Sequence, residues 1–299
     1  MYSILITGGT GLIGKHLSLL LQSKGHHITV LSRKHSKKTN VFYWNVNKNY
    51  IDSEAIINSD YIIHLAGAGI ANKHWNKSRK KELIDSRIQT TNLLLRKVKE
   101  LNPSLKGFIA ASGIGYYGAI TSSKIFTEKD KNGSDFLSLV CRLWEKASSQ
   151  FNTLSIRTVI FRTGIVFSKK GGALQKIKKP IKLGFGSPIG SGNQFMPWIH
   201  IEDLCNMYIK AIENPNLKGI YNAVAPEHIT NKFLTYEVAK TLKKKIWLPN
   251  IPRFVLKILF GEMAIILLKG SRVSSDKISK TGFKFRFPDL KSALLSLNK

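Results

Sequence analysis

The feature that most constrains this chain is a glycine-rich turn near the N-terminus, between an apolar segment and a periodic one. Residues 3–7 (SILIT) predict a strand and residues 13–24 predict a helix. Gly8, Gly11 and Gly14 lie where the two meet. In a dinucleotide-binding βαβ unit, glycines at this spacing allow a tight turn, close approach of backbone to a pyrophosphate, and close helix–strand packing. Free N–H groups at the helix N-terminus then bind the phosphates. A turn without a ligand is the alternative, and the strand–turn–helix context favours the dinucleotide.

The rest of the chain alternates short apolar runs with amphipathic ones. The segments predicted as strands are residues 3–7, 28–32, 41–44, 61–65, 107–112, 154–161 and 219–224. The segments predicted as helices include residues 13–24, 78–101 and 136–151. Buried strands that alternate with helices indicate βαβ units and a parallel sheet covered on both faces. The predicted fold class is α/β, a Rossmann-type doubly wound parallel sheet with a small, mainly helical C-terminal substrate lobe.

The composition along the chain predicts two units. Residues 1–168 form the predicted dinucleotide-binding Rossmann domain, which residues 199–225 approximately complete. Residues 169–198 are irregular and rich in Gly, Lys and Pro, and residues 226–299 are mostly helical in pattern. These last two segments are predicted to form a smaller substrate or cap region.

The end of the second predicted strand distinguishes between cofactors. NAD-binding proteins usually place Asp or Glu there to bind the ribose 2′-hydroxyl. This chain has Ser32 and Arg33 with no acidic residue in reach. A guanidinium can bind a 2′-phosphate in bidentate fashion, and arginine is scarce in a chain whose basic residues are mostly lysine. The sequence therefore favours NADP(H), with NAD(H) less favoured.

The net positive charge is large, but it does not identify a partner. The formal charge is +29, from 47 Lys and Arg against 18 Asp and Glu. The lysines are spread along the whole chain, which favours a solvated surface, with attraction to anionic substrates or nucleic acid as the alternative. No nucleic-acid-binding motif accompanies them. The expected partner is a small-molecule substrate, with no specific nucleic acid, and a homo-oligomer stays open.

Cysteine content and hydropathy predict a cytoplasmic protein. Cys141 and Cys205 are too few for a disulfide framework and lack the spacing of metal ligands. The first strand begins at about residue 3, which leaves no room for a signal peptide. The most apolar stretch, residues 254–268, is interrupted by Lys257, Gly261 and Glu262. It is too short to span a bilayer, so we expect a packed helix and no membrane partner.

Several motifs together resemble a known superfamily. The segments 61–67 (YIIHLAG), 111–118 (ASGIGYYG) and 197–203 (PWIHIED), with the glycine spacing, resemble the extended short-chain dehydrogenase/reductases. More narrowly, the chain resembles the atypical branch labelled "epimerase family", NAD-dependent epimerase/dehydratase-like proteins with their own C-terminal domain. The residues that carry this narrower resemblance are Trp75, 79–81 (RKK), 85–87 (DSR), 141–145 (CRLWE), 162–164 (RTG), 190–192 (GSG), 222–226 (NAVAP) and 282–288 (GFKFRFP).

The resemblance implies a nicotinamide cofactor across the carboxyl ends of the strands. It does not imply a substrate. The residues predicted to contact the cofactor are Thr7, Gly8, Gly11, Leu12, Ile13, Gly14, Ser32, Arg33, Leu65, Ala66 and Gly67.

The residues expected to carry the reaction depart from the superfamily's pattern. Typical members use a serine, a Tyr-x-x-x-Lys pair and an upstream asparagine, in which tyrosine exchanges a proton with the substrate oxygen. Here Leu137 and Cys141 occupy the tyrosine and lysine positions, and Arg87 occupies the asparagine position. The predicted catalytic residues are Ser112, Tyr117 and Arg87. Packing or substrate contact is the alternative role for Tyr117, and a helix-surface position is the alternative for Arg87.

Other polar residues are predicted to have structural roles. His200 and Asp203 are two possible metal ligands without a third, so no metal site is predicted, and an acid near a helix start is explained by capping. His64 is expected at a strand end near the cofactor, and Glu128 as a solvated loop acid. Two functions remain open: an NADP(H)-dependent oxidoreductase or epimerase acting on an anionic or sugar-like molecule, which we favour, and a non-catalytic NADPH-binding sensor.

Overall fold

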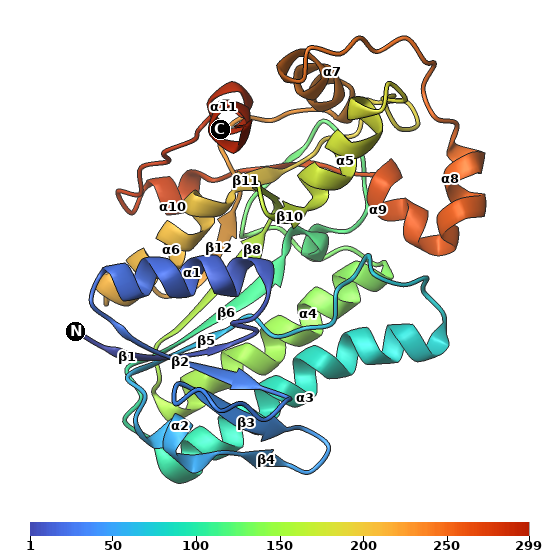
Figure 1. The fold of residues 1–299 in the computed structure, drawn as a ribbon. Coiled ribbons are helices and arrows are strands. Elements are labelled where there is room, and N and C mark those ends of the chain that lie inside the picture. The colour runs from blue at the N-terminus through green and yellow to red at the C-terminus, as the bar shows by residue number, and fades with distance from the viewer. Residues whose placement is uncertain (299) are drawn as a thin grey trace.

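A computed structural model describes residues 1–298 and is built around an eight-stranded sheet (Figure 1). The strand order is β12-β8-β6-β5-β1-β2-β3-β4, and every neighbouring pair is parallel except β3 and β4. The strands are β1 (Ser3–Thr7), β2 (His27–Ser32), β3 (Val41–Asn45), β4 (Tyr50–Ile51), β5 (Tyr61–His64), β6 (Gly107–Gly113), β8 (Thr158–Thr163) and β12 (Gly219–Ala223). This order reverses direction at β1, as in a doubly wound fold, so the predicted fold class is confirmed.

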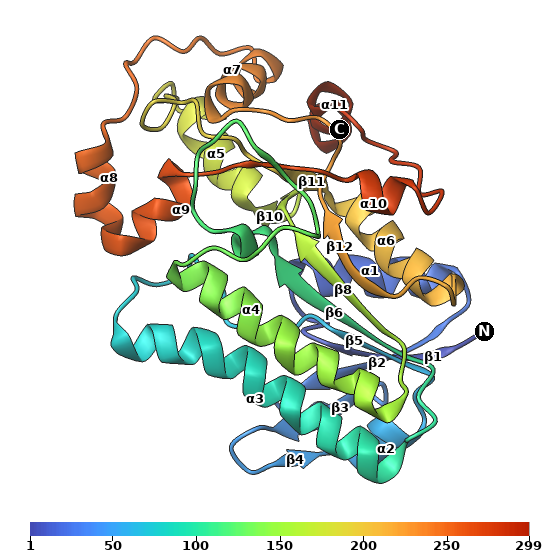
Figure 2. The same ribbon diagram turned by 180° about the vertical axis from the view of Figure 1, so that it is seen from behind.

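Helices cover both faces of this sheet (Figures 1 and 2). On one face lie α1 (Leu12–Ser23) and α6 (Ile201–Glu213), and on the other lie α2 (Ser53–Ile57), α3 (Lys77–Leu101) and α4 (Phe136–Ser149). Side chains alternate along the strands, because successive residues of a strand point to opposite faces. In β1, Ile4 and Ile6 pack with Leu17 of α1, whereas Leu5 packs with Leu93 of α3.

Capping residues determine where two of these helices begin. Asn76 accepts a hydrogen bond from the backbone N–H of Arg79 at the start of α3. Asp135 accepts one from Ser138 N–H at the start of α4. Each cap satisfies one of the backbone donors that the first turn of a helix leaves unpaired.

The remaining elements form the upper part of the molecule in Figure 1. Two small sheets pair β9 (Ile165–Ser168) with β10 (Gly171–Gly172) and β11 (Trp198–His200), and β7 (Ile125–Phe126) with β13 (Arg272–Val273). The helices are α5 (Ala173–Lys182), α7 (Asn231–Thr241), α8 (Arg253–Phe260), α9 (Ile265–Leu268), α10 (Asp276–Ser279) and α11 (Leu290–Asn298). Short 3-10 helices occupy Ile114–Tyr117 and Gly261–Ala264, and a third, Gln150–Leu154, follows α4 in the main sheet domain. This region has its own core, in which Phe167 and Trp198 stack 5.3 Å apart beside Leu294.

The C-terminal region contacts the main sheet domain at defined points. Asp203 of α6 accepts hydrogen bonds from Arg286 N–H (2.8 Å) and Phe287 N–H (3.0 Å), which fixes the chain before α11. An ion pair between Lys80 of α3 and Glu262, 2.6 Å long, joins the segment between α8 and α9 to the sheet domain.

The apolar stretch at residues 254–268 differs from its prediction as one packed helix. The chain leaves helical geometry at Gly261, whose φ is +56°, so α8 and α9 are separate helices with a 3-10 turn between them. Leu256 is buried, but Phe254 and Ile258 are largely exposed. The prediction of a packed helix was therefore wrong for α8. In residues 1–298, no helix is both long and apolar enough to cross a membrane.

Candidate cofactor site

The turn between β1 and α1 has the shape that its glycines require. Gly8 has φ +71°, and its carbonyl accepts a hydrogen bond from Gly11 N–H at 2.9 Å. A Cβ at Gly14 would lie 2.4 Å from that carbonyl oxygen, so only glycine allows the helix to start this close to the turn. Within the described residues 1–298, no side chain caps α1 at Gly11. The first N–H groups of α1 are therefore free to bind an anion.

The chain after β5 packs directly against this turn. A Cβ at Gly8 would lie 2.9 Å from the carbonyl carbon of Leu65. The side-chain oxygen of Thr7 accepts a hydrogen bond from Ala66 N–H (3.2 Å) and lies 2.7 Å from His64 Nδ1. The structure thus brings Thr7, Gly8, Leu65 and Ala66 together at the carboxyl ends of two adjacent strands. Thr7 is fully buried and ties the two segments together.

His64 connects the end of β5 both to Thr7 of β1 and to α3. Its ring is fully buried, with Thr90 and Thr91 hydroxyls 3.3 and 3.1 Å from Nε2. Burial lowers the pKa of His64 to about 3, so the imidazole is neutral near pH 7. This geometry gives His64 a structural place at the strand end.

Arg87 supports the next part of the chain after β5. Its Nη2 donates to Ala68 O (3.1 Å) and its Nη1 donates to Leu83 O (2.8 Å). A Cβ at Gly67 would lie 3.1 Å from the guanidinium carbon, and the centroid of the Trp144 ring lies 5.0 Å from that carbon. Burial lowers the pKa of Arg87 from its ordinary value. Arg87 therefore lies in the interior, beneath Gly67, and its alternative as a surface residue is excluded.

The end of β2 presents Arg33 to solvent. Ser32 Oγ accepts from Lys34 N–H at 3.0 Å, so Ser32, Arg33 and Lys34 form a tight turn just past the strand. Arg33 and Lys34 are exposed. Because β1 and β2 are adjacent and parallel, this turn lies at the same edge of the sheet as the glycine turn.

A buried ion pair joins the carboxyl end of β8 to α4, beside the carboxyl end of β6, and sequence reasoning did not predict it. Arg162 donates from Nε and Nη2 to the two carboxylate oxygens of Glu145, each at 2.8 Å. Ser112 Oγ donates to Glu145 Oε1 at 2.7 Å. All three residues are buried. The signal was present in the motifs 141–145 and 162–164, which support the family resemblance but show no spacing that pairs them.

The same network includes Tyr117 on its other side. The hydroxyl of Tyr117 donates to Asn222 Oδ1 (2.6 Å) and accepts from Arg162 Nη1 (3.0 Å). Burial raises the pKa of Tyr117 to about 12, although Arg162 opposes the shift. The half-buried Tyr116 ring lies over the Arg162 guanidinium at 3.3 Å from its centroid. Ser112 and Tyr117 are thus brought together through Arg162 and Glu145, and their roles toward a substrate stay a prediction.

Asn222 connects this network to the C-terminal region. Its Nδ2 donates to Ser274 O at 3.1 Å, and its backbone N–H donates to Glu128 Oε1 at 2.8 Å. Glu128, expected as a solvated loop acid, instead links its loop to β12. The polar network therefore runs from the sheet to the segment that follows β13.

Apolar groups line the positions where the superfamily's proton-transfer pair would lie. A Cβ at Gly115 would lie 3.2 Å from Leu137 Cβ, and a Cβ at Gly113 would lie 3.6 Å from Cys141 Sγ. Leu137 and Cys141 therefore face the segment after β6. Burial raises the pKa of Cys141 to about 11, so the thiol is neutral near pH 7.

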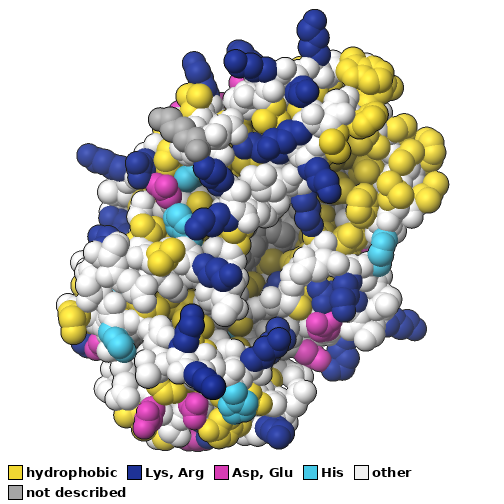
Figure 3. Space-filling model, in the orientation of Figure 1, with side chains coloured by type: hydrophobic (Ala, Val, Ile, Leu, Met, Phe, Trp, Pro, Cys, Tyr) yellow, Lys and Arg dark blue, Asp and Glu magenta, His cyan; other side chains and the backbone are white. Residues whose placement is uncertain are grey.

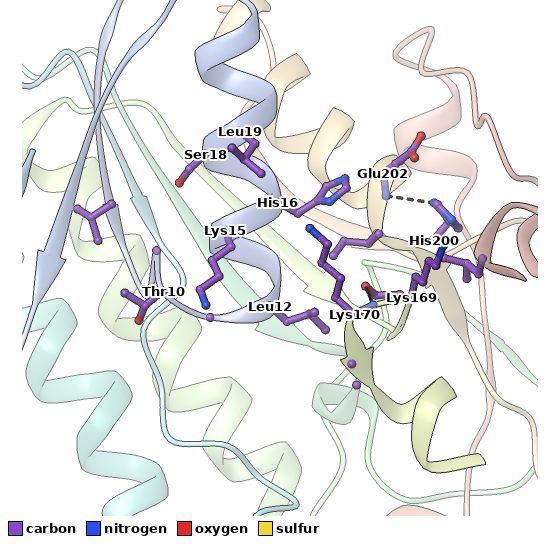
Figure 4. A pocket seen from close by; sticks show the side chains of 18 of the residues that line it. Thr10, Leu12, Lys15, His16, Ser18, Leu19, Lys169, Lys170, His200 and Glu202 are labelled. Carbon is purple, nitrogen blue, oxygen red and sulfur yellow. Dashed lines mark hydrogen bonds between the residues drawn. The ribbon is translucent and has the colours of Figure 1, made fainter. Parts of the chain in front are cut away.

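A pocket of about 770 Å³ lies between α1 and the β9–β10 hairpin. Figure 4 shows Lys15 pointing toward Thr10 of the glycine turn and Lys170 pointing toward His16. His200 takes part in the wall of this pocket, where its Nδ1 accepts from Glu202 N–H at 3.1 Å. Within residues 1–298 there is no group of three His, Cys, Asp or Glu side chains that could hold a metal ion.

The strand order and the uncapped glycine turn at the carboxyl ends of β1 and β5 define a dinucleotide-binding Rossmann-type protein. The family model described as "NAD dependent epimerase/dehydratase family" matches residues 4–224, and "Domain of unknown function (DUF1731)" matches residues 251–297. The chain belongs to the NAD-dependent epimerase/dehydratase family, in agreement with the resemblance of its motifs.

Individual relatives span nearly the whole chain. The epimerase family protein YfhF of Bacillus subtilis is 35% identical over 99% of this chain and 97% of its own. The human epimerase family protein SDR39U1, solved with NADPH, is 33% identical, with a TM-score of 0.90 over 99% of this chain and 98% of that one. A nucleoside-diphosphate sugar epimerase from Corynebacterium glutamicum is 29% identical, with a TM-score of 0.81 over 98% of this chain and 57% of that one.

Proposed function

We propose that this protein binds NADP(H) and acts as an oxidoreductase or epimerase on an anionic or sugar-like small molecule. The observation that carries the proposal is the glycine turn, packed against Leu65 and Ala66, with Arg33 exposed at the same sheet edge. The residues present fit a dinucleotide, because the turn leaves backbone N–H donors free and Gly14, which has no Cβ, lets α1 begin directly against the turn. In this proposal residues 1–168 and about 199–225 bind the cofactor, and residues 169–198 and 226–299 bind the substrate.

Two observations support NADP(H) over NAD(H). Arg33 and Lys34 place positive charge after β2, where a 2′-phosphate would lie, and no acidic residue follows the strand directly. The human relative with a TM-score of 0.90 was solved with NADPH.

A cytoplasmic setting agrees with two cysteines that are both free and buried.

In the proposed reaction the cofactor supplies the redox chemistry, and the protein's side chains position the cofactor and the substrate. When bound, the nicotinamide supplies or accepts a hydride at its C4 carbon. Arg87 donates a hydrogen bond to Ala68 O, so it would position the backbone that follows β5 beside the cofactor. Glu145 and Arg162 fix Ser112 and Tyr117, whose hydroxyls would polarise a substrate oxygen once they exchange their present partners for it.

The substrate class rests on charge and on one relative. The formal charge of +29 favours an anionic molecule, whereas Lys15, Lys169 and Lys170 line the pocket at the glycine turn, where they would attract the phosphates of the cofactor. The 29% identical relative is a nucleoside-diphosphate sugar epimerase, which suggests a nucleotide-linked sugar as the first class to test.

A non-catalytic NADPH sensor is the second candidate, and a specific observation favours it. Leu137 and Cys141 lie where a proton-transferring pair is expected, and the Tyr117 hydroxyl already has two partners in the interior. A protein of this kind would bind the dinucleotide and convey its presence through a partner.

A turnover assay separates the two candidates. The NADPH complex is incubated with nucleotide sugars, sugar phosphates and oxo acids while the absorbance of reduced nicotinamide is followed and the sugar products are analysed for epimers. The enzyme predicts a reaction with one class that Ser112→Ala and Tyr117→Phe both reduce by about tenfold or more, whereas Tyr43→Phe on β3 leaves it unchanged. Turnover that survives both network variants would contradict the proposed roles. No reaction with any class, despite tight NADPH binding, would favour the sensor.

A further inference from the structure

An exposed apolar surface covers α8 and the two segments beside it. We call this surface the apolar face, and its members are Leu183, Phe185, Trp247, Phe254, Ile258 and Leu259. Ile258 is 77% exposed and Trp247 is 68% exposed. Figure 3 shows hydrophobic side chains gathered over α8 and over the chain that leads into it. Single exposed apolar side chains are ordinary, whereas a continuous group of large ones marks an interaction surface.

The local structure fixes these side chains in an outward position. Phe254 and Ile258 are four residues apart on α8, so they lie on one face of the helix. Leu256 is the buried residue of this helix. Trp247 Nε1 donates to Gly184 O at 3.0 Å, which joins the chain before α8 to the turn that carries Leu183 and Phe185.

Basic side chains lie in the same segments as the apolar face. They are exposed, and they comprise Lys182, Lys243, Lys244, Lys245, Arg253 and Lys257. None of them forms an ion pair with a carboxylate among residues 1–298. The chain as a whole carries a formal charge of +29. A partner that covers this face must therefore offer both apolar contact and negative charge.

We propose that the apolar face docks on the surface of an anionic lipid bilayer. Phe254, Ile258 and Trp247 would enter the boundary between headgroups and acyl chains, while Arg253 and Lys257 bind acidic headgroups. Long basic side chains can keep their charge at the headgroups while their stems lie along apolar surface. Figure 1 places α8 at the outer edge of the molecule, where it can meet a flat surface. An acidic protein or a second copy of this chain would need a complementary shape, and the excess of positive charge disfavours the second copy.

The sequence did not predict that this surface is exposed. The expectation of no membrane partner rested only on whether the segment could span a bilayer. Residues 254–268 are too short and too interrupted to span a bilayer, but lying in its interface needs no span. The fold shows which side of α8 is left uncovered.

Sedimentation with lipid vesicles tests the proposal on the full-length protein. We expect binding to vesicles of phosphatidylcholine with phosphatidylglycerol, little binding to phosphatidylcholine alone, and weaker binding as salt is raised. Phe254→Ser with Ile258→Ser should reduce binding by about tenfold or more. Ile57→Ser with Leu295→Ser, at exposed apolar positions of α2 and α11, is the matched control and should leave binding unchanged.

A second pair of variants tests whether the charge acts locally. Arg253→Gln with Lys257→Gln should weaken binding about thirtyfold. Lys48→Gln with Lys99→Gln removes the same charge from exposed positions far from α8 in the fold and should have a much smaller effect. All these positions are exposed, so thermal unfolding should stay at the wild-type midpoint.

Three results would overturn the proposal: equal binding to neutral vesicles, equal loss of binding in the two charge variants, or no binding to either vesicle. A dimer in size-exclusion chromatography that Phe254→Ser with Ile258→Ser dissociates, without vesicle binding, would assign the face to a second copy. Specific capture of an acidic protein without vesicle binding would assign it to that protein. NADPH binding is measured in parallel, so failure here is distinct from failure of the proposed function.

Discussion

Arg162 on β8 and Glu145 on α4 form two parallel hydrogen bonds of 2.8 Å each in the interior of the protein. The pair joins a strand of the main sheet to a covering helix, and it also holds Ser112 and Tyr117. Burying two charges is costly unless their hydrogen-bonding groups are satisfied. Here both carboxylate oxygens accept from the guanidinium, and Ser112 supplies a further donor. The network therefore fixes the polar groups at the carboxyl ends of β6 and β8.

Removing one member of this ion pair should strongly destabilise the protein. Glu145→Ala leaves Arg162 as an uncompensated buried charge, so we expect a loss of about 3–5 kcal/mol in the free energy of unfolding. Urea denaturation measures it. The double variant Glu145→Leu with Arg162→Met should be more stable than Glu145→Ala, because neither charge remains. A Glu145→Ala loss below about 1 kcal/mol, the range of exposed pairs, would contradict the buried pairing.

The two neighbouring tyrosines should differ in their contribution to stability. Tyr117→Phe removes an acceptor from Arg162 and a donor from Asn222, so we expect a cost of about 1–3 kcal/mol. Tyr116→Phe keeps the ring that packs on Arg162, so it should cost about 0.5 kcal/mol or less. Thermal and urea unfolding of the two variants give the comparison. A larger loss for Tyr116→Phe would show that the wrong hydroxyl is placed in the network.

Two buried histidines should make the protein less stable in mild acid. Burial lowers the pKa of His64 to about 3 and that of His200 to about 4, both below the ordinary value near 6.5. Below that ordinary value the unfolded chain binds protons that the folded chain does not, so stability is present above about pH 6.5 and is lost as the pH falls toward the folded values. The slope should approach about 1.4 kcal/mol per pH unit for each histidine.

Urea denaturation between about pH 7 and pH 5 measures this slope before most carboxylates titrate. His64→Gln should reduce the slope toward that expected for one buried histidine, because one of the two rings that resist protonation in the folded state is removed. A free energy of unfolding that is constant over this range would contradict the buried, neutral state of both rings.

Gly14→Ala should disrupt the turn between β1 and α1. The added Cβ would lie 2.4 Å from Gly8 O and 2.6 Å from Gly9 Cα, so the backbone must move. We expect NADPH affinity to fall by about tenfold or more, with some loss of stability. Ser23→Ala, at the other end of α1, removes a hydrogen bond to Leu20 O and serves as the control, with affinity unchanged. Unchanged NADPH binding in Gly14→Ala would contradict the proposed site.

The sequence predicted the fold class and the position of the glycine turn because both depend on local patterns. Each strand and helix shows its own pattern of apolar residues in the sequence, and the two patterns alternate along the chain. Gly8, Gly11 and Gly14 belong to one short segment. The domain boundaries at residues 168 and 226 stay predictions. The second strand's end was also predictable, since Ser32 and Arg33 follow a recognisable apolar run.

The polar network and the apolar face could not be predicted in this way. Glu145, Arg162 and Asn222 come from distant segments, and only the parallel arrangement of β6, β8 and β12 brings them together. For α8, the periodicity of an apolar stretch says that one side is apolar but not what covers it. Phe254 and Ile258 are left exposed because of how α8 packs in the tertiary fold, where Leu256 is the buried side chain.

The most direct test of the account is a fluorescence titration of the wild-type protein and Arg33→Glu with NADPH and NADH. We predict that the wild type binds NADPH more tightly than NADH, because Arg33 meets the 2′-phosphate. Arg33→Glu should lower the affinity for NADPH by about tenfold or more and leave the affinity for NADH unchanged. Arg96→Glu, at an exposed position of α3, should change neither affinity. Equal wild-type affinities for the two cofactors, or an Arg33→Glu variant that keeps its preference for NADPH, would contradict the account.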